Sequence, residues 1–404
     1  MDLADHYAPA TAALEPVAIR EIADRIADSG DDVISLAAGW PDERTFPAPV
    51  LDELTGDVLA ERPDEALQYG TTRGYRRLRE QVVARLNDRH GLDYGPENVL
   101  ITAGSQQALY LLARAFVADG DEIAVGAPTY VAALAAFRSY RDPEVVPVPL
   151  DDDGLRVDAL ADRLAAGASP TLLYTVPTFQ NPTGTTLSAA RRDRLVETAA
   201  AHDVPIVEDQ PYRDLRYDGD PREPLVARAP DRVVHVGSFS KVLAPGMRLG
   251  YVVAPADLIR QLEVIKQPVD LQTNVFAQHV VSEYVATGAI DEAVERTRSL
   301  YREKRDAAFA ALEERFPDEV TWTRPDGGMF LWVDLPDGVD ADAMLADALD
   351  AGVAYVPGDA FYVDAADPDA GASSLRLCFA YADVDEIREG VARLADVLRT
   401  TRGE

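Results

Sequence analysis

Short apolar runs alternate with longer amphipathic stretches along the middle of this chain. The apolar runs are Val99–Ile101, Ile123–Val125, Leu172–Tyr174, Ile206–Val207 and Val233–Val236. Between them, stretches such as Gln106–Val117 and Ala189–Ala201 carry apolar residues at helical spacing. This alternation of strand and helix predicts an α/β fold with a mainly parallel sheet and helices on both of its faces.

The last third of the chain is patterned differently. A long helical stretch from about Ile290 to Phe316 leads into it. The expected strands are Met329–Leu335, Ala354–Val356 and Ser374–Phe379, and the expected helices cover about 340–350 and 384–399. Asp383 and Glu386 have the spacing of a capping box at the start of the last helix. This mixture of elements predicts a smaller α+β domain.

These two patterns divide the chain into two domains and a leading segment. We expect a large domain over residues 51–295 and a small C-terminal domain over residues 296–404 that includes the bridging helix. Residues 1–50 are expected to pack with the small domain.

Composition excludes several classes of protein. The hydrophobic fraction of 47% is normal for a globular chain, and no apolar run is long enough to span a membrane. The N-terminus is acidic, which is not typical of a signal peptide, so we expect a cytoplasmic protein. The single cysteine, Cys378, excludes an intramolecular disulfide framework. The five histidines lack ligand spacing, and no metal is expected.

The formal net charge of this 404-residue chain is −31, with 70 acidic residues. Such a surface repels nucleic acid and anionic membranes, so neither is expected as a partner. The acidic residues are spread along the whole chain, which makes the charge a property of the folded surface. Only three lysines accompany 36 arginines. Together these features resemble the cytosolic proteins of salt-in halophiles, where high ionic strength screens the self-repulsion.

One of the three lysines, Lys241, follows an apolar strand and two serines in the segment 233–241. Arginine cannot form a Schiff base, whereas a desolvated lysine can be neutral and attack an aldehyde. Lys241 is therefore a candidate to carry pyridoxal 5′-phosphate (PLP). The alternative interpretation is an ordinary surface charge after a strand.

Polar residues follow four of the expected strands. They are Gly104–Gln106, Asn181–Gly184, Glu208–Tyr212 and Gly237–Lys241, the last with Arg248 seven residues later. In open parallel sheets, ligands bind beyond the carboxyl ends of the strands. A Gly-Ser pair before a helix suits an anion, because free backbone N–H groups point at it. Each cluster alone is typical of a cap, a turn or a structural carboxylate, but their joint placement predicts a single cofactor site.

Seven colinear segments carry a resemblance to a known family. They are Ile34–Gly39, Leu67–Gly70, Thr102–Leu109, Phe179–Gly184, Gly237–Leu249, Gly327–Phe330 and Leu375–Leu377. With these segments the chain resembles the class I/II aminotransferases of PLP fold type I, above all the branch of 2-aminoadipate and kynurenine aminotransferases. The resemblance covers essentially the whole chain apart from the extreme N-terminus.

The resemblance implies roles for the residues around the cofactor ring. Lys241 would hold PLP through its amine and then move a proton between the substrate Cα and the cofactor C4′. Asp209 would pair with the pyridine nitrogen and keep it protonated. Tyr212 and Asn181 would hydrogen-bond the phenolic oxygen, and Tyr130 would stack on the ring.

A second group of residues would hold the cofactor phosphate, through a helix start, hydroxyl groups and a guanidinium. By the same resemblance they are Ser105, Gln106, Ser238, Ser240 and Arg248. Tyr69 resembles the tyrosine that the family donates to the phosphate across a dimer interface. The resemblance therefore implies a homodimer with shared active sites.

Arg376 is the candidate to bind the substrate α-carboxylate. In the strand 375–379 a charge alternates with apolar neighbours, so its face must meet water or an anion. A solvated edge strand would explain this pattern, but the resemblance implies a bidentate clamp on the carboxylate. Gly39 and Asn181 would also contact the substrate.

Arg20 lies in an amphipathic stretch near the N-terminus. Related enzymes use an arginine in such a segment to meet the distal group of the substrate, but a salt bridge with Asp24 or Glu21 explains Arg20 equally well. The family's usual Gly-Gly-x-Pro is Ala-Gly-Trp-Pro at residues 38–41 of this chain. Because Trp40 could narrow or reshape the substrate pocket, the resemblance does not define which substrate the pocket accepts.

We expect a ping-pong aminotransferase that moves an amino group from an L-amino acid to a 2-oxo acid, with 2-oxoglutarate as acceptor. The amino donor is left open between aromatic, branched-chain, 2-aminoadipate and aspartate-like amino acids. The first alternative is a PLP-dependent C–S or other β-lyase on the same fold. The second is a non-catalytic regulatory PLP-binding protein, although binding alone does not need Lys241, Asp209 and Arg376 together.

Overall fold

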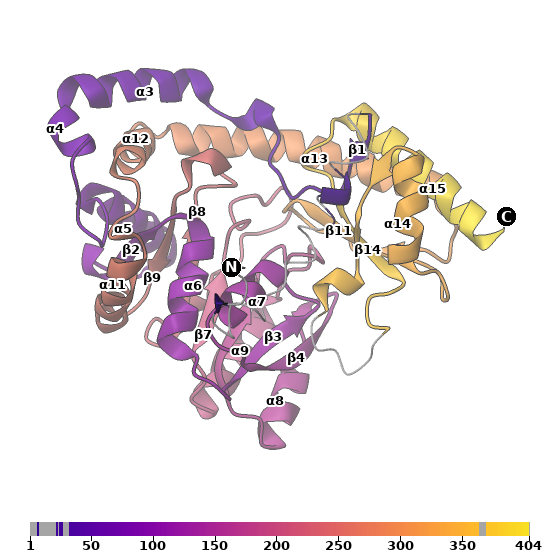
Figure 1. The fold of residues 1–404 in the computed structure, drawn as a ribbon, viewed down its shortest axis with the longest axis horizontal. Helices are drawn as coiled ribbons and strands as arrows, with labels where there is room; N and C mark the ends of the chain where they lie inside the picture. The colour runs from indigo at the N-terminus through magenta and orange to yellow at the C-terminus, as the bar shows by residue number, and fades with distance from the viewer. Residues whose placement is uncertain (1–5, 8–21, 23, 27–31, 363–368, 404) are drawn as a thin grey trace.

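The computed structural model describes residues 6–7, 22, 24–26, 32–362 and 369–403 of the chain. Its centre is an eight-stranded sheet in the order β2-β9-β8-β7-β6-β3-β4-β5 (Figure 1). The strands are β2 (Val99–Thr102), β3 (Glu122–Ala127), β4 (Glu144–Asp151), β5 (Gly154–Leu155), β6 (Pro170–Thr175), β7 (Ile206–Asp209), β8 (Val233–Ser238) and β9 (Gly250–Val253). Five neighbouring strands, from β8 to β4, run parallel, and β9 runs antiparallel between β2 and β8. The predicted mainly parallel sheet is confirmed.

Helices cover both faces of this sheet, because adjacent residues of a buried strand point to opposite sides. Leu172 of β6 packs into the core on one face, and Leu173 into the core on the other. The first face is covered by α6 (Gly104–Phe116), α7 (Val131–Arg138) and α11 (Ala256–Asp270), and the second by α8 (Val157–Ala165), α9 (Ala189–Ala201) and α10 (Leu225–Arg228). The sheet is therefore the middle layer of three.

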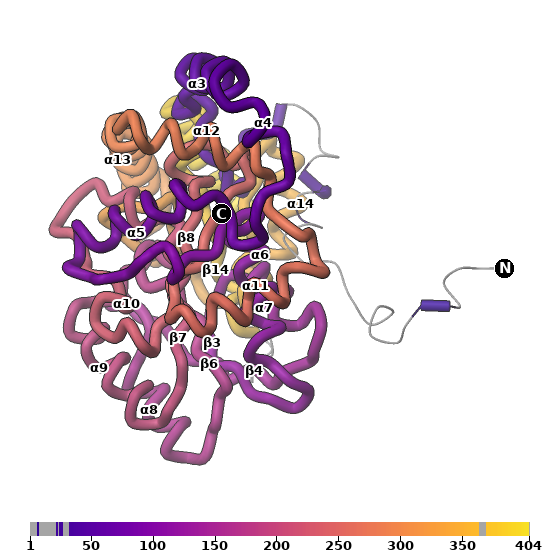
Figure 2. The backbone as a smooth tube through the Cα atoms, turned by 90° about the vertical axis from the view of Figure 1, so that its left-hand side faces the viewer, coloured from indigo at the N-terminus to yellow at the C-terminus, as the bar shows by residue number. Residues whose placement is uncertain are grey.

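A further helical layer lies beside the β2 edge of the sheet. Its members are α3 (Ala48–Glu61), α4 (Pro63–Ala66), α5 (Arg76–His90) and α12 (Val275–Ala286). Leu78 and Val280 are buried between these helices, and α12 contacts α3, α4 and α5 (Figure 2). The 27-residue helix α13 (Ala289–Arg315) then runs from α12 toward the C-terminal part of the chain (Figure 1).

The C-terminal part is built on a second sheet in the order β10-β11-β14-β13, with antiparallel pairing throughout. These strands are β10 (Thr321–Trp322), β11 (Phe330–Asp334), β13 (Val356–Pro357) and β14 (Ser374–Cys378), and α14 (Ala341–Asp350) and α15 (Val384–Arg402) pack with them. The capping box of Asp383 and Glu386 at the start of α15 is confirmed. A separate pair of parallel strands joins β1 (Ile34–Ser35) to β12 (Val353–Ala354).

One expected strand is divided in two. The sequence pattern predicts a single strand over Ala354–Val356, but β12 and β13 flank Tyr355 and belong to different sheets. Tyr355 is fully buried, and its hydroxyl donates to the carbonyl of Ala341 at 2.6 Å. This buried hydrogen bond holds the chain at the point where it passes from one sheet to the other.

Candidate active site

The carboxyl ends of neighbouring strands bring most of the predicted site residues to one edge of the large sheet. Asp209 ends β7, and Lys241 follows β8 in the next position of the sheet. Asn181 follows β6 on the other side of β7, and Ser105 lies in the first turn of α6. The sheet topology therefore collects side chains that are far apart in sequence.

The Asp209 carboxyl is almost completely buried, with one of its two oxygens unpaired. The Tyr174 hydroxyl donates to Oδ2 at 3.1 Å, and no donor among the described residues reaches Oδ1. Burial raises the pKa of Asp209 to about 7, although Tyr174 and the backbone N–H of Gln210 partly offset this. An unpaired buried carboxylate oxygen is costly, so this group fits a partner that brings a positively charged N–H.

The Lys241 amine lines the same site. Its Nζ donates to the carbonyl of Gly39 at 2.7 Å, which joins the turn after β8 to the segment after β1. Burial, together with the positive charges of Arg376 and Arg248, lowers the pKa of Lys241 to about 8. About a tenth of this amine is therefore neutral at about pH 7 and can act as a nucleophile or base.

Close backbone packing shapes the start of α6. Gly104 has φ +74°, and a Cβ built on it would lie 2.8 Å from Nη2 of Arg248. A Cβ on Gly250 would lie 2.6 Å from the backbone N of Ser105. Ala103, the N-cap of α6, makes no side-chain hydrogen bond to the helix start. Free N–H groups, a guanidinium and a helix dipole therefore meet at this point, and they suit a phosphate.

Other predicted phosphate-site residues have partners of their own. The Ser240 N–H donates to Oγ of Ser238 at 3.1 Å, which closes the turn before Lys241. Gln106 donates through Nε2 to the carbonyl of Ala132 at 2.7 Å. The Gln106 side chain therefore ties the start of α6 to the start of α7, directly after Tyr130, which is the N-cap of α7.

Arg376 is buried from β14 with its guanidinium between two phenyl rings. Its carbon Cζ lies 4.4 Å from the ring centre of Phe330 and 4.9 Å from that of Phe361. Nη1 donates to Oδ1 of Asn181 at 2.9 Å and Nη2 to the carbonyl of Ala37 at 2.7 Å, while Nε has no partner among the described residues. Burial lowers the pKa of Arg376. A cation held in an apolar sandwich with a spare N–H fits a carboxylate ligand.

Tyr212 completes the wall between the two sheets. Its ring meets the ring of Phe330 edge-on, with centroids 5.6 Å apart. Burial raises the pKa of Tyr212 well above its usual value, so the phenol stays neutral and can donate a hydrogen bond.

Of the predicted residues, Tyr69 lies apart from this cluster, and Arg20 falls outside the described residues. Tyr69 lies between α4 and α5 and is 78% exposed in the single chain. Arg20 lies outside the described residues, so its predicted contact with the substrate, or with Asp24 or Glu21, has no structural counterpart here.

The residues that hold the predicted site residues in place carry little signal in the sequence. The sequence pattern places Tyr174 only within an apolar strand, yet its hydroxyl donates a hydrogen bond to Asp209. Phe361 lies outside every motif, and its pairing with Arg376 depends on chain folding. The only signal was at Phe330, which belongs to the motif 327–330 but had no assigned role.

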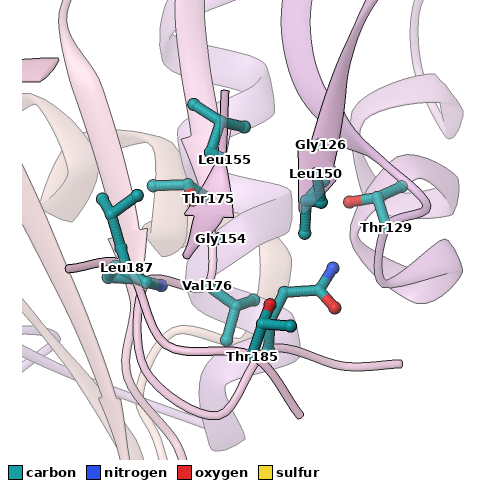
Figure 3. A pocket seen from close by; sticks show the side chains of 11 residues that line it. Gly126, Thr129, Leu150, Gly154, Leu155, Thr175, Val176, Thr185 and Leu187 are labelled. Carbon is teal, nitrogen blue, oxygen red and sulfur yellow. The ribbon is translucent and has the colours of Figure 1, made fainter. Parts of the chain in front are cut away.

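A small cavity lies behind the strand ends. It measures about 10 Å³, room for about one water molecule, and Thr129, Thr175 and Thr185 lie around it (Figure 3). The side chain of Gln180 also lines it, and its Nε2 donates to the carbonyl of Pro128 at 2.9 Å. The cavity is too small for a substrate.

The sequence profile of the family described as Aminotransferase class I and II matches residues 31–394. The chain belongs to this family. An aromatic-amino-acid aminotransferase of Thermococcus litoralis is 44% identical over 99% of this chain and 95% of its own length.

Solved aminotransferase structures superpose closely on this chain. The kynurenine aminotransferase of Pyrococcus horikoshii, solved in complex with PMP, is 42% identical with a TM-score of 0.93 and covers 99% of this chain and 98% of its own. The α-aminoadipate aminotransferase of Thermus thermophilus, complexed with N-(5′-phosphopyridoxyl)-L-leucine, is 35% identical with a TM-score of 0.90 over 100% of both chains. The expected resemblance, the fold type I architecture and the PLP cofactor are confirmed.

The unpaired buried atoms provide an independent test of the cofactor. Within the described part of the chain, Asp209 Oδ1 lacks a donor and Arg376 Nε lacks an acceptor, and the amine of Lys241 lies in the same site. A protonated pyridine nitrogen and a substrate carboxylate would satisfy the first two. The residues of this aminotransferase therefore fit PLP and an amino-acid substrate.

Proposed function

We propose that this PLP-dependent aminotransferase moves the amino group of an L-amino acid to 2-oxoglutarate by a ping-pong mechanism. The observation that carries the proposal is the buried Arg376 guanidinium, which keeps an unpaired N–H in the same site as the Lys241 amine. Arg376 would bind the α-carboxylate that both the amino donor and the oxo-acid acceptor possess. In a ping-pong reaction the donor and the acceptor bind one after the other, so Arg376 could bind the α-carboxylate of each in turn.

In this proposal the residues around the cofactor ring have distinct tasks. PLP, when bound, supplies the electron sink for the charge left on the substrate Cα. Asp209 would accept a hydrogen bond from the pyridine nitrogen and keep it protonated, a pairing that would also lower the cost of its own buried charge. Lys241 would bind the cofactor and later carry a proton between Cα and C4′. Tyr212 and Asn181 would hydrogen-bond the phenolic oxygen, with Tyr130 against the ring face.

The phosphate would be held at the start of α6. Ser105 and Gln106 would contribute through their backbone N–H groups, because the side chain of Gln106 is already bonded to Ala132. Ser238, Ser240 and Arg248 would complete the set. One guanidinium–phosphate bond contributes about 1.5–3 kcal/mol, so several contacts together would retain the cofactor when Lys241 is released.

We propose that the active unit is a homodimer. Large apolar side chains are exposed in the single chain along α3, α4 and α11 and the loops that follow them. They include Leu59, Leu67, Tyr69, Val264, Val269 and Leu271. Exposure of several large apolar side chains is typical of a protein–protein interface. Tyr69 is one of them and would reach the phosphate of the second subunit.

The proposed setting of the enzyme is a cytoplasm of high ionic strength. No helix in the described part of the chain is long and apolar enough to cross a membrane. The net charge of −31 supports a salt-rich solvent, which would screen repulsion within and between subunits.

Spectroscopy tests the proposed reaction. The purified protein in concentrated KCl should show the visible band of lysine-bound PLP, and L-glutamate should convert it to the pyridoxamine form. Lys241→Ala should lack the band. A band that L-glutamate leaves unchanged, together with release of pyruvate and ammonia from a donor with a β-leaving group, would favour a β-lyase instead. Donor preference would follow from a panel of aromatic, branched-chain, acidic and 2-aminoadipate donors.

A further inference from the structure

The chain has three lysines, all in its described part, and none of them lies on the outer surface. Lys241 lines the cofactor site, whereas the side chains of Lys266 and Lys304 are 0% exposed. The other 36 basic residues are arginines. A compact ammonium with three donors fits where acceptors converge on a point, and a planar guanidinium does not. The contacts of the two remaining lysines therefore show what a buried ammonium does in this fold.

Lys266 lies at the end of α11, behind the start of α6. Its Nζ donates to both carboxylate oxygens of Asp270 at 2.6 Å and to Oε1 of Gln107 at 3.0 Å. Gln107 in turn donates to Asp270 at 2.7 Å, and its Oε1 accepts the backbone N–H of Ala103 at 2.8 Å. This cluster therefore fixes the residue that leads into the proposed phosphate-binding turn.

The same end of α11 also holds the Tyr69 segment. Leu271, directly after Asp270, has φ +62°, a conformation that a leucine adopts only when its surroundings hold it. Gln272 Oε1 then accepts the backbone N–H of Gly70 at 2.6 Å. One helix end thus positions the phosphate-binding turn and the segment proposed to serve the second subunit.

Lys304 lies in α13, on the substrate side of the site. Its Nζ donates to Oδ2 of Asp42 at 2.6 Å, to the carbonyl of Ala380 at 2.7 Å and to that of Tyr381 at 3.1 Å. All three donors are used. Burial alone would raise the pKa of Asp42, but hydrogen bonds from Arg44 and Lys304 hold it below its usual value, so the pair is ionised.

The three acceptors of Lys304 belong to the two segments that form the substrate side. Asp42 follows Gly39, whose carbonyl accepts the Lys241 amine, and Trp40, whose ring meets that of Tyr381 edge-on at 5.5 Å. Ala380 and Tyr381 follow β14, which carries Arg376. Lys304 therefore holds the Gly39–Trp40 segment and the Arg376 strand at a fixed separation.

We infer that Lys266 and Lys304 are positioning residues with separate tasks, Lys266 for the cofactor phosphate and Lys304 for the substrate. The inference rests on the proposed function, because it assigns the start of α6 to the phosphate and Arg376 to the substrate carboxylate. Neither ammonium touches cofactor or substrate in this assignment. Each acts through the backbone that it holds.

Paired substitutions separate the two tasks. Lys266→Met and Lys304→Met keep most of the unbranched side chain and remove the ammonium group. Arg260→Met in α11 and Arg296→Met in α13 are matched exposed controls. PLP affinity is measured by titration of the apoprotein, and substrate affinity by the L-glutamate concentration that half-saturates conversion of the PLP-loaded protein.

Lys266→Met should weaken PLP binding about tenfold or more with unchanged half-saturation by L-glutamate, since a charged hydrogen-bond cluster is lost behind the phosphate turn. Lys304→Met should raise the half-saturating L-glutamate concentration about tenfold or more with unchanged PLP affinity. Lys266→Arg and Lys304→Arg should not restore the parent values, because a guanidinium does not fit the three convergent acceptors. The two control variants should match the parent.

A merely structural role predicts a different result. If PLP affinity and the half-saturating L-glutamate concentration change together in each variant, the inference is wrong. It is also wrong if only the melting temperature falls. If a methionine variant fails to fold, Asp270→Asn and Asp42→Asn weaken the same two clusters with little change of shape and should show the same split. Loss of PLP binding or of glutamate conversion in the parent protein would instead overturn the proposed function.

Discussion

Burial shifts the pKa values of two groups in the proposed cofactor site, one at the end of β7 and one directly after β8. The Asp209 carboxyl has a pKa raised to about 7, and the Lys241 amine has one lowered to about 8. Both shifts favour the neutral form, because a charge without a partner is costly in a site of low dielectric. PLP would bring a ring cation for Asp209 and an aldehyde for Lys241. It would therefore give each of these two buried groups the partner that it lacks in the free protein.

The lowered pKa of Lys241 predicts how the apoprotein captures PLP. Only the neutral amine attacks the aldehyde, so the capture rate should rise with pH through a midpoint near 8, whereas an ordinary lysine would give a midpoint near 10.5. Stopped-flow measurement of the lysine-bound band over a series of pH values gives this midpoint. Nα-acetyl-lysine amide, treated identically, corrects for ionisation of PLP itself. A midpoint near 10 for the protein would contradict the burial argument.

At the scale of elements, glycine allows β9 to approach the start of α6. A side chain at Gly250 would meet the backbone of Gly104 and Ser105 at 2.6 Å, and neither atom can rotate away. Gly250→Ala should therefore cost about 1–3 kcal/mol of stability and displace the proposed phosphate-binding turn. The expected result is a lower melting temperature together with weaker PLP binding.

Gly56→Ala is the matched control for this prediction. Gly56 lies in the middle of α3, and no atom lies within 4 Å of a Cβ built on it. Because alanine favours the helix, this change should stabilise the protein by about 0.5–1 kcal/mol and leave PLP binding unchanged. Equal PLP affinity in both variants would show that β9 does not support the turn.

Sequence patterns predicted the elements whose signals are local. The buried parallel strands are continuous apolar runs, so the sequence alone identifies them. Asp209 and Lys241 are polar residues at the ends of such runs, and the sequence identifies them in the same way. Strand β9 was missed because it is four residues long, begins with glycine and pairs antiparallel with β2, which is far away in sequence, as well as with the nearby β8. The Phe330–Arg376–Phe361 sandwich was missed because only chain folding brings the three residues together.

At the scale of the molecule, the excess of acid predicts a dependence on salt. The net charge of −31 repels itself and a second subunit of the same charge, and screening shortens from about 10 Å at about 0.1 M salt to about 3 Å at about 1 M. Transfer from concentrated KCl to dilute buffer should therefore release PLP or dissociate the dimer. Light scattering and the visible band follow both events. Full activity after prolonged dialysis into dilute buffer would count against a halophilic origin.

Replacement of surface lysine by arginine also decides where the chain can be cut. A protease that cleaves only after lysine has three target bonds in the whole sequence, after Lys241, Lys266 and Lys304. The first lies in the proposed cofactor site, and the other two follow side chains that are fully buried in the native fold. The intact outer surface therefore offers such an enzyme nothing to cleave. Cleavage after Lys241, Lys266 or Lys304 would therefore show that the proposed active site has opened near the cofactor, behind the phosphate-binding turn or on the substrate side, respectively.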